Sequence, residues 1–252
     1  MESKKSLDTM AAPNLSEHCI KTVNSHRVLF AHMSVGSNIL DGLSAKNRSI
    51  KEQLLIKIIE PASSGKTYDQ GINHIKIGAN SQPYQKLSNF REFLAANDNG
   101  RLFDLVGIKF CYVDVTRKTD IHALFKTYDA LVKDMQERYP HIKFVHFTVP
   151  LTTHYSSLKN RIKTLILGDQ DNIKRNAFNE LLCATYKKQE IIDIARIEST
   201  FPNGSRMQHS YFLAKHYSLI PAYTTDGGHL NDLGKTRVAA EFIGGICKAL
   251  SD

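Results

Sequence analysis

Short apolar runs alternate with longer segments of helical periodicity along most of the chain. Five runs, each bounded by polar or turn residues, have the length and composition of strands: 28–32, 74–77, 105–112, 142–148 and 191–195. Segment 119–139 places apolar residues at helical spacing, with Thr119 or Asp120 available to cap its start and Pro140 to end it. Segment 232–250 shows the same spacing and predicts a final helix that packs on the sheet.

Alternating strands and helices predict parallel βαβ units, in which helices cover both faces of the sheet. We therefore expect an α/β fold, a three-layer α/β/α sandwich. A length of 252 residues fits one domain with a substantial core. Residues 1–24 are polar and without sustained periodicity, so we expect an N-terminal tail or arm there and a single domain over 25–252.

The net charge of +8 arises from 33 basic and 25 acidic residues. Because the basic residues are scattered, this charge disfavours nucleic-acid binding and is more consistent with attraction to an anionic substrate or surface. The longest apolar runs fall short of the ~18 residues that a membrane span needs. Residues 6–24 contain no apolar core of a signal peptide. For the chain as given we expect a cytoplasmic protein, an expectation that no longer holds, leaving an extracytoplasmic location open, if the natural chain is longer.

Metal and cofactor chemistry is not indicated by the pattern of cysteines and histidines. The four cysteines are widely spaced and form no Cys-x-x-Cys motif: Cys19, Cys111, Cys183 and Cys247. We interpret all four as thiols. His209 and His216 lie seven residues apart among aromatic residues, which favours packing over metal binding. We expect neither a metal site nor a cofactor, and an activity that survives chelation.

Candidate chemistry comes from a serine at the end of the first strand and a distant Asp-x-x-His sequence. Ser34 follows the apolar run 28–32, so it lies at the carboxyl edge of the predicted sheet, where open α/β folds bind ligands. A serine hydroxyl becomes a useful nucleophile when a histidine takes its proton and a carboxylate orients that histidine. Asp226 and His229 have the spacing to do this. The alternative is that Ser34 caps the following helix, and the two roles are compatible.

These residues resemble the SGNH (GDSL-like) hydrolase superfamily over about residues 26–250. The resemblance implies a flavodoxin-like fold with a five-stranded parallel sheet, and action on esters or transfer of acyl groups. Ser34, in His-Met-Ser-Val-Gly-Ser-Asn (32–38), matches the nucleophile, although the Gly-Asp that precedes it in the family is missing. Asp-Gly-Gly-His (226–229) fits the last block fully. The first block and Lys-Phe-Cys-Tyr-Val-Asp (109–114) resemble a divergent bacterial branch.

The resemblance also implies an oxyanion hole, with one important departure. Its donors would be the N–H groups of Ser34 and Gly78, but Val113 stands where the family has a donor asparagine. Loss of one such donor typically costs ~10²–10³ in rate, so another group must compensate. Asn80 is our candidate, and the amide of Asn38 and the Lys109 ammonium are further possibilities. Gly78 and Asn80 are also compatible with simple turn roles.

Three further polar residues at the strand ends have two interpretations each. His32 either contacts a substrate oxygen or is a satisfied core histidine. Lys109 and Asp114 either contact substrate or form a structural ion pair with each other, and we favour the ion pair.

The sequence therefore predicts a metal-independent serine esterase of SGNH type. We expect its substrate to be a small-molecule or carbohydrate acyl ester, and the acyl acceptor to be either water or a sugar hydroxyl. Val113 and the missing Gly-Asp support an alternative, a catalytically degenerate SGNH-fold protein that binds glycan or a protein partner.

Overall fold

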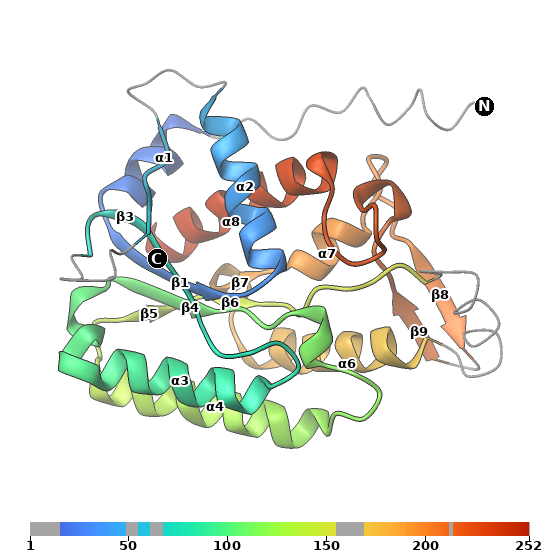
Figure 1. Ribbon diagram of the computed structural model, residues 1–252, viewed down its shortest axis with the longest axis horizontal. Helices are drawn as coiled ribbons and strands as arrows, with labels where there is room; N and C mark the ends of the chain where they lie inside the picture. The colour runs from blue at the N-terminus through green and yellow to red at the C-terminus, as the bar shows by residue number, and fades with distance from the viewer. Residues whose placement is uncertain (1–15, 49–54, 61–67, 155–168, 212–213, 252) are drawn as a thin grey trace.

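The computed structural model describes residues 16–48, 55–60, 68–154, 169–211 and 214–251 (Figure 1). Its middle layer is a five-stranded parallel sheet with the order β2-β3-β1-β4-β5. The strands are β1 (Arg27–His32), β2 (Ile58–Ile59), β3 (Gly71–Lys76), β4 (Leu105–Ile108) and β5 (Lys143–Phe144). One residue after β5, the chain continues as β6 (His146–Phe147), which pairs in parallel with β7 (Ile191–Ile192).

Helices cover both faces of this sheet, as Figure 1 shows. One face carries α1 (Glu17–Asn24), α2 (Val35–Asn47), α7 (Ile194–Ser199) and α8 (Asp232–Ser251). The other carries α3 (Pro83–Ala95), α4 (Ile121–Arg138) and α6 (Gln170–Thr185). Shorter elements are the 3-10 helices η2 (Ala96–Leu102), η3 (Tyr112–Asp114), η4 (Lys188–Glu190) and η5 (Pro221–Tyr223), and the hairpin of β8 (Gln208–Tyr211) and β9 (Ala214–Tyr217).

Strand β1 is buried on both sides and joins the two cores. Val28 and Phe30 pack in the core under α2 and α8, whereas Leu29 and Ala31 pack in the core over α3 and α4. This alternation is the period of a β-strand between two helical layers. The predicted three-layer α/β/α sandwich with a five-stranded parallel sheet is confirmed.

Element bounds differ from the sequence prediction mainly at strand ends. Both predicted helices are present as α4 and α8, and the Asp120 side chain caps α4 by accepting a hydrogen bond from the Ala123 N–H at 3.0 Å. The strand predicted over 105–112 ends at Ile108, since the chain turns into η3. The run 191–195 is a strand only over β7, because Asp193 caps the helix that follows it.

The segment expected to be a tail contains a helix. Residues 1–15 lie outside the described part, but α1 is capped by Ser16 and buries Ile20 and Val23 in the core. Two buried positions in an eight-residue helix give too short a pattern to stand out in a polar sequence. Cys19 in α1 forms a disulfide with Cys247 in α8, so the expectation of four thiols is wrong for this pair.

No helix in the described ranges has the length and apolar character to cross a membrane.

Candidate functional site

The structure brings together three residues from the two distant sequence motifs. Ser34 lies between the end of β1 and the start of α2, and His229 and Asp226 lie in the loop before α8. Ser34 Oγ is 2.6 Å from His229 Nε2, across a separation of 195 residues. His229 Nδ1 is 2.6 Å from Asp226 Oδ2. A hydroxyl, an imidazole and a carboxylate thus form one hydrogen-bonded chain, the arrangement in which a serine can lose its proton to a histidine.

Ser34 adopts an unusual backbone conformation, with φ of 48° and ψ of −106°. A serine in this region is strained, and such strain is retained where the surrounding structure fixes it. Ser34 stands at the N-cap position of α2, yet its side chain makes no capping bond and reaches His229 instead. Of the two roles considered for this hydroxyl, the geometry favours the nucleophile. Gly36 allows the tight turn, since a Cβ there would lie 2.4 Å from the Cβ of His32.

The loop that carries Asp226 and His229 is held by its own backbone. Asp226 Oδ1 accepts hydrogen bonds from the N–H groups of Gly228, at 2.9 Å, and His229, at 2.7 Å. The Tyr112 ring lies edge-on to the His229 ring, with centroids 5.6 Å apart. Asn38, in α2, accepts a hydrogen bond from the Leu230 N–H at 3.1 Å. Asn38 therefore positions the loop beside His229, and its Oδ1 is already engaged.

Charge at this site is set by Asp226. Desolvation opposes its ionisation, but hydrogen bonds from the His229 ring and from the backbone of Gly228 and His229 outweigh that effect and hold the pKa of Asp226 well below its ordinary value. An ionised carboxylate accepts the Nδ1–H of His229, which leaves Nε2 free to take the serine proton. The two side chains are 52% and 44% exposed, so a substrate can approach the pair from solvent.

The segment that carries Gly78 and Asn80, two candidate oxyanion donors, leaves the sheet at the same edge as Ser34. The Ile77 N–H donates to the His32 carbonyl, so the loop that begins at Gly78 starts beside the end of β1. Gly78 has a φ of +64°, and a Cβ there would lie 2.6 Å from Lys86 Cγ. The Lys86 ammonium donates to Asn80 Oδ1 at 3.3 Å. The oxygen end of the Asn80 amide is thereby fixed, and its other end is a hydrogen-bond donor.

Val113 lines a cleft of about 390 Å³ next to Asp226. Most of the side chains that line this cleft are polar or charged, among them Tyr112, Thr116, Thr152, Asp171 and Arg175.

His32 and Lys109, two of the residues considered for substrate contact, are buried. His32 is 1% exposed, with Nε2 3.4 Å from His74 Nδ1, and burial together with the charge of Lys109 lowers its pKa to about 3. Lys109 is fully buried, donates to the Phe110 carbonyl at 2.9 Å, and has a pKa lowered by that burial. Both side chains are out of a substrate's reach in this conformation, which favours core roles.

The favoured ion pair between Lys109 and Asp114 is wrong. Asp114, 3% exposed, pairs instead with Lys86 of α3, whose Nζ lies 2.5 Å from Asp114 Oδ2. Lys86 extends beneath Gly78 to reach this carboxylate. Lys86 is buried on the same face of α3 as Phe90. A lysine on the apolar face of a helix was the sequence signal that could have indicated a buried ion pair.

Sequence reasoning also missed Arg175, which is 3% exposed in α6. Its Nε donates to the carbonyls of Tyr112 and Val115, and its Nη1 donates to Thr152 Oγ1 at 2.9 Å. Arg175 therefore joins the floor of the cleft to α6. Its position between Lys174 and Asn176, in a polar stretch of that helix, gave no hint of these partners.

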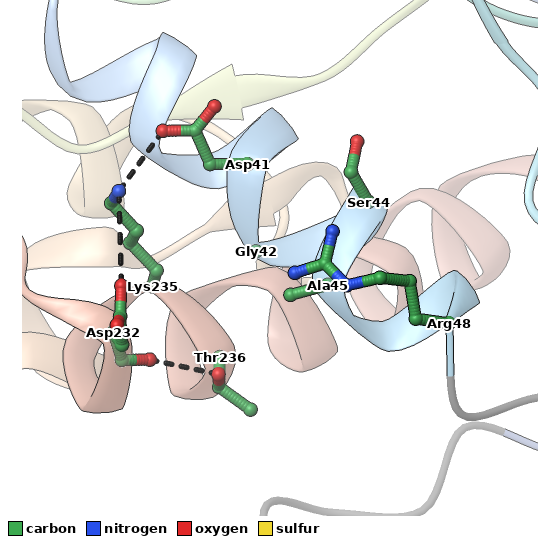
Figure 2. A pocket seen from close by; sticks show the side chains of 8 residues that line it. All are labelled: Asp41, Gly42, Ser44, Ala45, Arg48, Asp232, Lys235 and Thr236. Carbon is green, nitrogen blue, oxygen red and sulfur yellow. Dashed lines mark hydrogen bonds and ion pairs between the residues drawn. The ribbon is translucent and has the colours of Figure 1, made fainter.

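A second hollow, of about 410 Å³, lies between α2 and the start of α8 (Figure 2). Lys235 dominates it, with Nζ 3.0 Å from Asp41 Oδ2 and 4.0 Å from Asp232 Oδ1. Because two carboxylates neutralise this lysine and neither Ser34 nor His229 lines the hollow, we do not assign a function to it.

Comparisons with known proteins give a match only at the level of structure. No protein-family profile and no curated protein matches the sequence. A candidate acylhydrolase from Bacteroides fragilis superposes with a TM-score of 0.54 at 18% identity, covering 99% of this chain and 94% of that one. An acetyl xylan esterase superposes with a TM-score of 0.52 at 19% identity, covering 87% and 98%. The chain has the fold of these proteins.

Proposed function

We propose that this protein is a serine hydrolase of SGNH type that cleaves acyl esters. The observation that carries the proposal is the continuous hydrogen-bonded chain from Ser34 Oγ through His229 to Asp226, at the carboxyl edge of the sheet. The strained backbone of Ser34 supports it, because strain of this kind clusters at functional sites. The shared fold with an esterase and a candidate acylhydrolase is consistent with it.

In the proposed mechanism, Ser34 Oγ attacks the ester carbonyl while its proton passes to His229 Nε2. Asp226 stabilises the imidazolium that forms. The tetrahedral intermediate collapses when the C–O bond to the alcohol breaks, and the alcohol leaves with the proton from His229. Water then attacks the acyl-enzyme, gives its proton to His229, and releases the carboxylic acid and the free serine.

Hydrogen-bond donors must stabilise the negative charge on the oxygen of the tetrahedral intermediate, and the side chain of Val113 offers no such donor. We assign this role to the N–H groups of Ser34 and Gly78 and to the Asn80 amide. Support comes from the Lys86 contact, which holds the oxygen of the Asn80 amide and so directs its nitrogen elsewhere. Preorganised donors of this kind stabilise the transition state without reorganising during the reaction.

A carbohydrate O-acyl ester, such as an acetyl ester, is the substrate class we propose. Polar and charged side chains in the lining of the cleft beside Asp226, such as Thr152 and Arg175, can hydrogen-bond the hydroxyls of a sugar, and the half-exposed pair of Asp226 and His229 suits a bulky acceptor. If a sugar hydroxyl replaces water in the second step, the same residues perform acyl transfer. Acetate release from acetylated xylan, compared with acetyl transfer to an added oligosaccharide, distinguishes the two reactions.

A fluorophosphonate probe tests the proposal, because it phosphonylates activated serines. We expect one adduct per chain by intact mass, located on Ser34 by peptide mapping and absent from Ser34→Ala. Ser37→Ala, a serine one turn further along α2, is the matched control and should label normally. If folded protein stays unlabelled, the alternative of a non-catalytic glycan- or protein-binding role replaces our proposal.

A further inference from the structure

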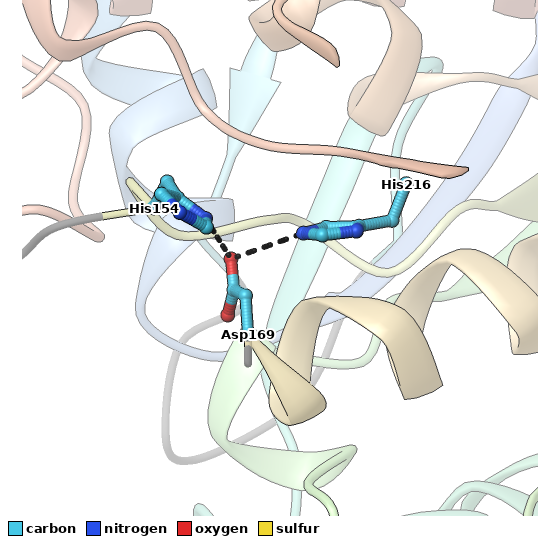
Figure 3. Close-up of side chains that lie close together, drawn as sticks. All are labelled: His154, Asp169 and His216. Carbon is cyan, nitrogen blue, oxygen red and sulfur yellow. Dashed lines mark ion pairs between the residues drawn. The ribbon is translucent and has the colours of Figure 1, made fainter. Parts of the chain in front are cut away.

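A second group of polar side chains gathers apart from the candidate triad (Figure 3). His154 follows Thr153, Asp169 immediately precedes α6, and His216 lies on β9. Figure 3 shows the two imidazoles directed at one carboxylate oxygen. His154 Nδ1 is 3.4 Å from Asp169 Oδ2, and His216 Nε2 is 3.7 Å from the same oxygen. All three donor atoms lie within 4.8 Å of one another.

His216 is a buried histidine whose ring nitrogens are unmatched. It is 1% exposed, and neither of its ring nitrogens makes a hydrogen bond. Buried polar groups are ordinarily hydrogen-bonded, because a group left unmatched has lost its hydrogen bonds to water without replacement. The 3.7 Å between Nε2 and the carboxylate is too long for a hydrogen bond, yet it leaves space for an ion between the two atoms.

We propose that His154 Nδ1, Asp169 Oδ2 and His216 Nε2 bind a divalent transition-metal ion, most suitably Zn²⁺. Tetrahedral zinc with bonds of about 2.0–2.1 Å separates its ligand atoms by about 3.3 Å, so the distances to Oδ2 require movements of only a few tenths of an ångström. Two imidazoles and one carboxylate suit zinc, whereas Mg²⁺ and Ca²⁺ prefer oxygen ligands. The fourth position is open to water or another ligand.

Neighbouring side chains hold the proposed ligands in place. Asn172 Nδ2 donates to Asp169 Oδ2 at 2.6 Å, and Arg175 Nη1 donates to Asn172 Oδ1 at 2.8 Å. The His209 ring stacks on the His154 ring, with centroids 3.9 Å apart. Such outer contacts orient metal ligands and tune their affinity. The site is thus supported on the side of α6 and on the side of the β8–β9 hairpin.

The proposed ion would be structural, and independent of the proposed esterase reaction. It shares no residue with the triad, but the Thr153 N–H donates to the Gly227 carbonyl, one residue after Asp226. An ion here would tie β9 and the start of α6 to the segment that supports the triad loop. Its loss should therefore reduce stability first.

Zinc binding to tag-free, EDTA-treated protein tests the site without any assay of activity. We expect about one Zn²⁺ per chain by equilibrium dialysis, and a Tm that rises with Zn²⁺ but not with Mg²⁺. Asp169→Asn keeps the volume of the side chain and should weaken binding by more than about 100-fold. His216→Ala should do the same. His141→Ala, a substitution of an exposed histidine, should bind like the wild type.

Substitution with Co²⁺ adds a spectroscopic readout, since nitrogen and oxygen ligands give visible absorption without a thiolate charge-transfer band. A thiolate band would assign the binding to Cys111 or Cys183 and overturn the proposal. Failure to bind stoichiometric zinc, or unchanged affinity in Asp169→Asn, would also overturn it. If His216→Ala does not fold, Asp169→Asn alone decides. Fluorophosphonate labelling of metal-free protein reports separately on Ser34.

Discussion

Lys86 and Asp114 form an ion pair of 2.5 Å that is almost completely shielded from solvent, and it joins α3, which follows β3, to η3, which follows β4. Asp114 Oδ1 also accepts a hydrogen bond from the Ser81 N–H at 2.9 Å. Both members of the ion pair hold Asn80 in place. Lys86 contacts the Asn80 side chain, and Asp114 binds the backbone of the next residue, Ser81. The ion pair therefore fixes the group that we assign as the replacement oxyanion donor.

Asn80→Ala should lower kcat by ~10²-fold or more and change KM little. The reason is that the amide bond to substrate strengthens mainly as charge develops on the carbonyl oxygen. Steady-state kinetics at matched folded fraction measure this effect. Gln82→Ala, a substitution of an exposed residue two positions away, is the control and should leave kcat and KM nearly unchanged. A pure loss of stability in Asn80→Ala, with kcat per folded molecule intact, would show that Asn80 is only a turn residue.

Asn38→Ala should behave differently, since Asn38 acts through the Leu230 backbone rather than on the substrate. We expect a loss of stability of about 1–2 kcal/mol and a smaller fall in kcat than for Asn80→Ala. A larger fall at Asn38 would reverse the two assignments.

Ser34→Ala should abolish ester hydrolysis and leave the free energy of unfolding within ~1 kcal/mol of the wild-type value, because the side chain makes no capping bond. Ser34→Gly should be equally inactive but more stable than Ser34→Ala by about 1 kcal/mol, since glycine relieves the positive φ. Urea denaturation of both variants measures the difference. Residual turnover in both would exclude Ser34 as the nucleophile.

Asp226→Asn should reduce kcat by about 10³–10⁴-fold with little loss of stability. The amide oxygen can still accept from Gly228 and His229, but an amide nitrogen facing His229 Nδ1 disfavours the tautomer that accepts the serine proton. Asp232→Asn, which removes a fully exposed carboxylate three residues after His229, is the matched control. Comparable losses in both variants would point to a general charge effect.

Glu198 should make the protein less stable as the pH rises from about 4.5 to about 8. Burial, opposed by hydrogen bonding to Leu151 and by the charge of Lys109, raises its pKa to about 8. The folded state then keeps a proton that the unfolded state releases above its ordinary pKa of 4.5, so unfolding is favoured through this window by up to about 4 kcal/mol.

Glu198→Gln removes this ionisation, so its stability relative to the wild type should increase between pH 5 and pH 8. Urea unfolding curves at the two pH values measure the change, with exposed Glu241→Gln as the control. Parallel pH profiles for Glu198→Gln and the wild type would mean that Glu198 ionises normally.

The parts of the fold and site that the sequence predicted are those encoded by local pattern. The α4 segment has five turns of regular apolar spacing, and β1 is a continuous apolar run, so both stand out without knowledge of their neighbours. Ser34 was found because a strand end followed by a helix start is a local signature, and Asp226 and His229 because their spacing is fixed by one short loop.

The remaining features depend on which elements lie side by side. Lys86 reaches Asp114 only because α3 passes beneath the loop after β3, and an alternative partner, Lys109, was closer in sequence. The cluster of His154, Asp169 and His216 draws on three separate elements with no short spacing between its members. Tertiary contacts of this type leave no periodic or motif signal in a single sequence.

The bond between Cys19 and Cys247 turns most of this domain into a covalent ring. The ring spans 228 residue steps and includes the central sheet and all three members of the candidate triad. A protease that nicks any single peptide bond within it therefore leaves both fragments in one molecule, with Ser34 and His229 still tethered to each other. Only reduction of the disulfide would let the two pieces part.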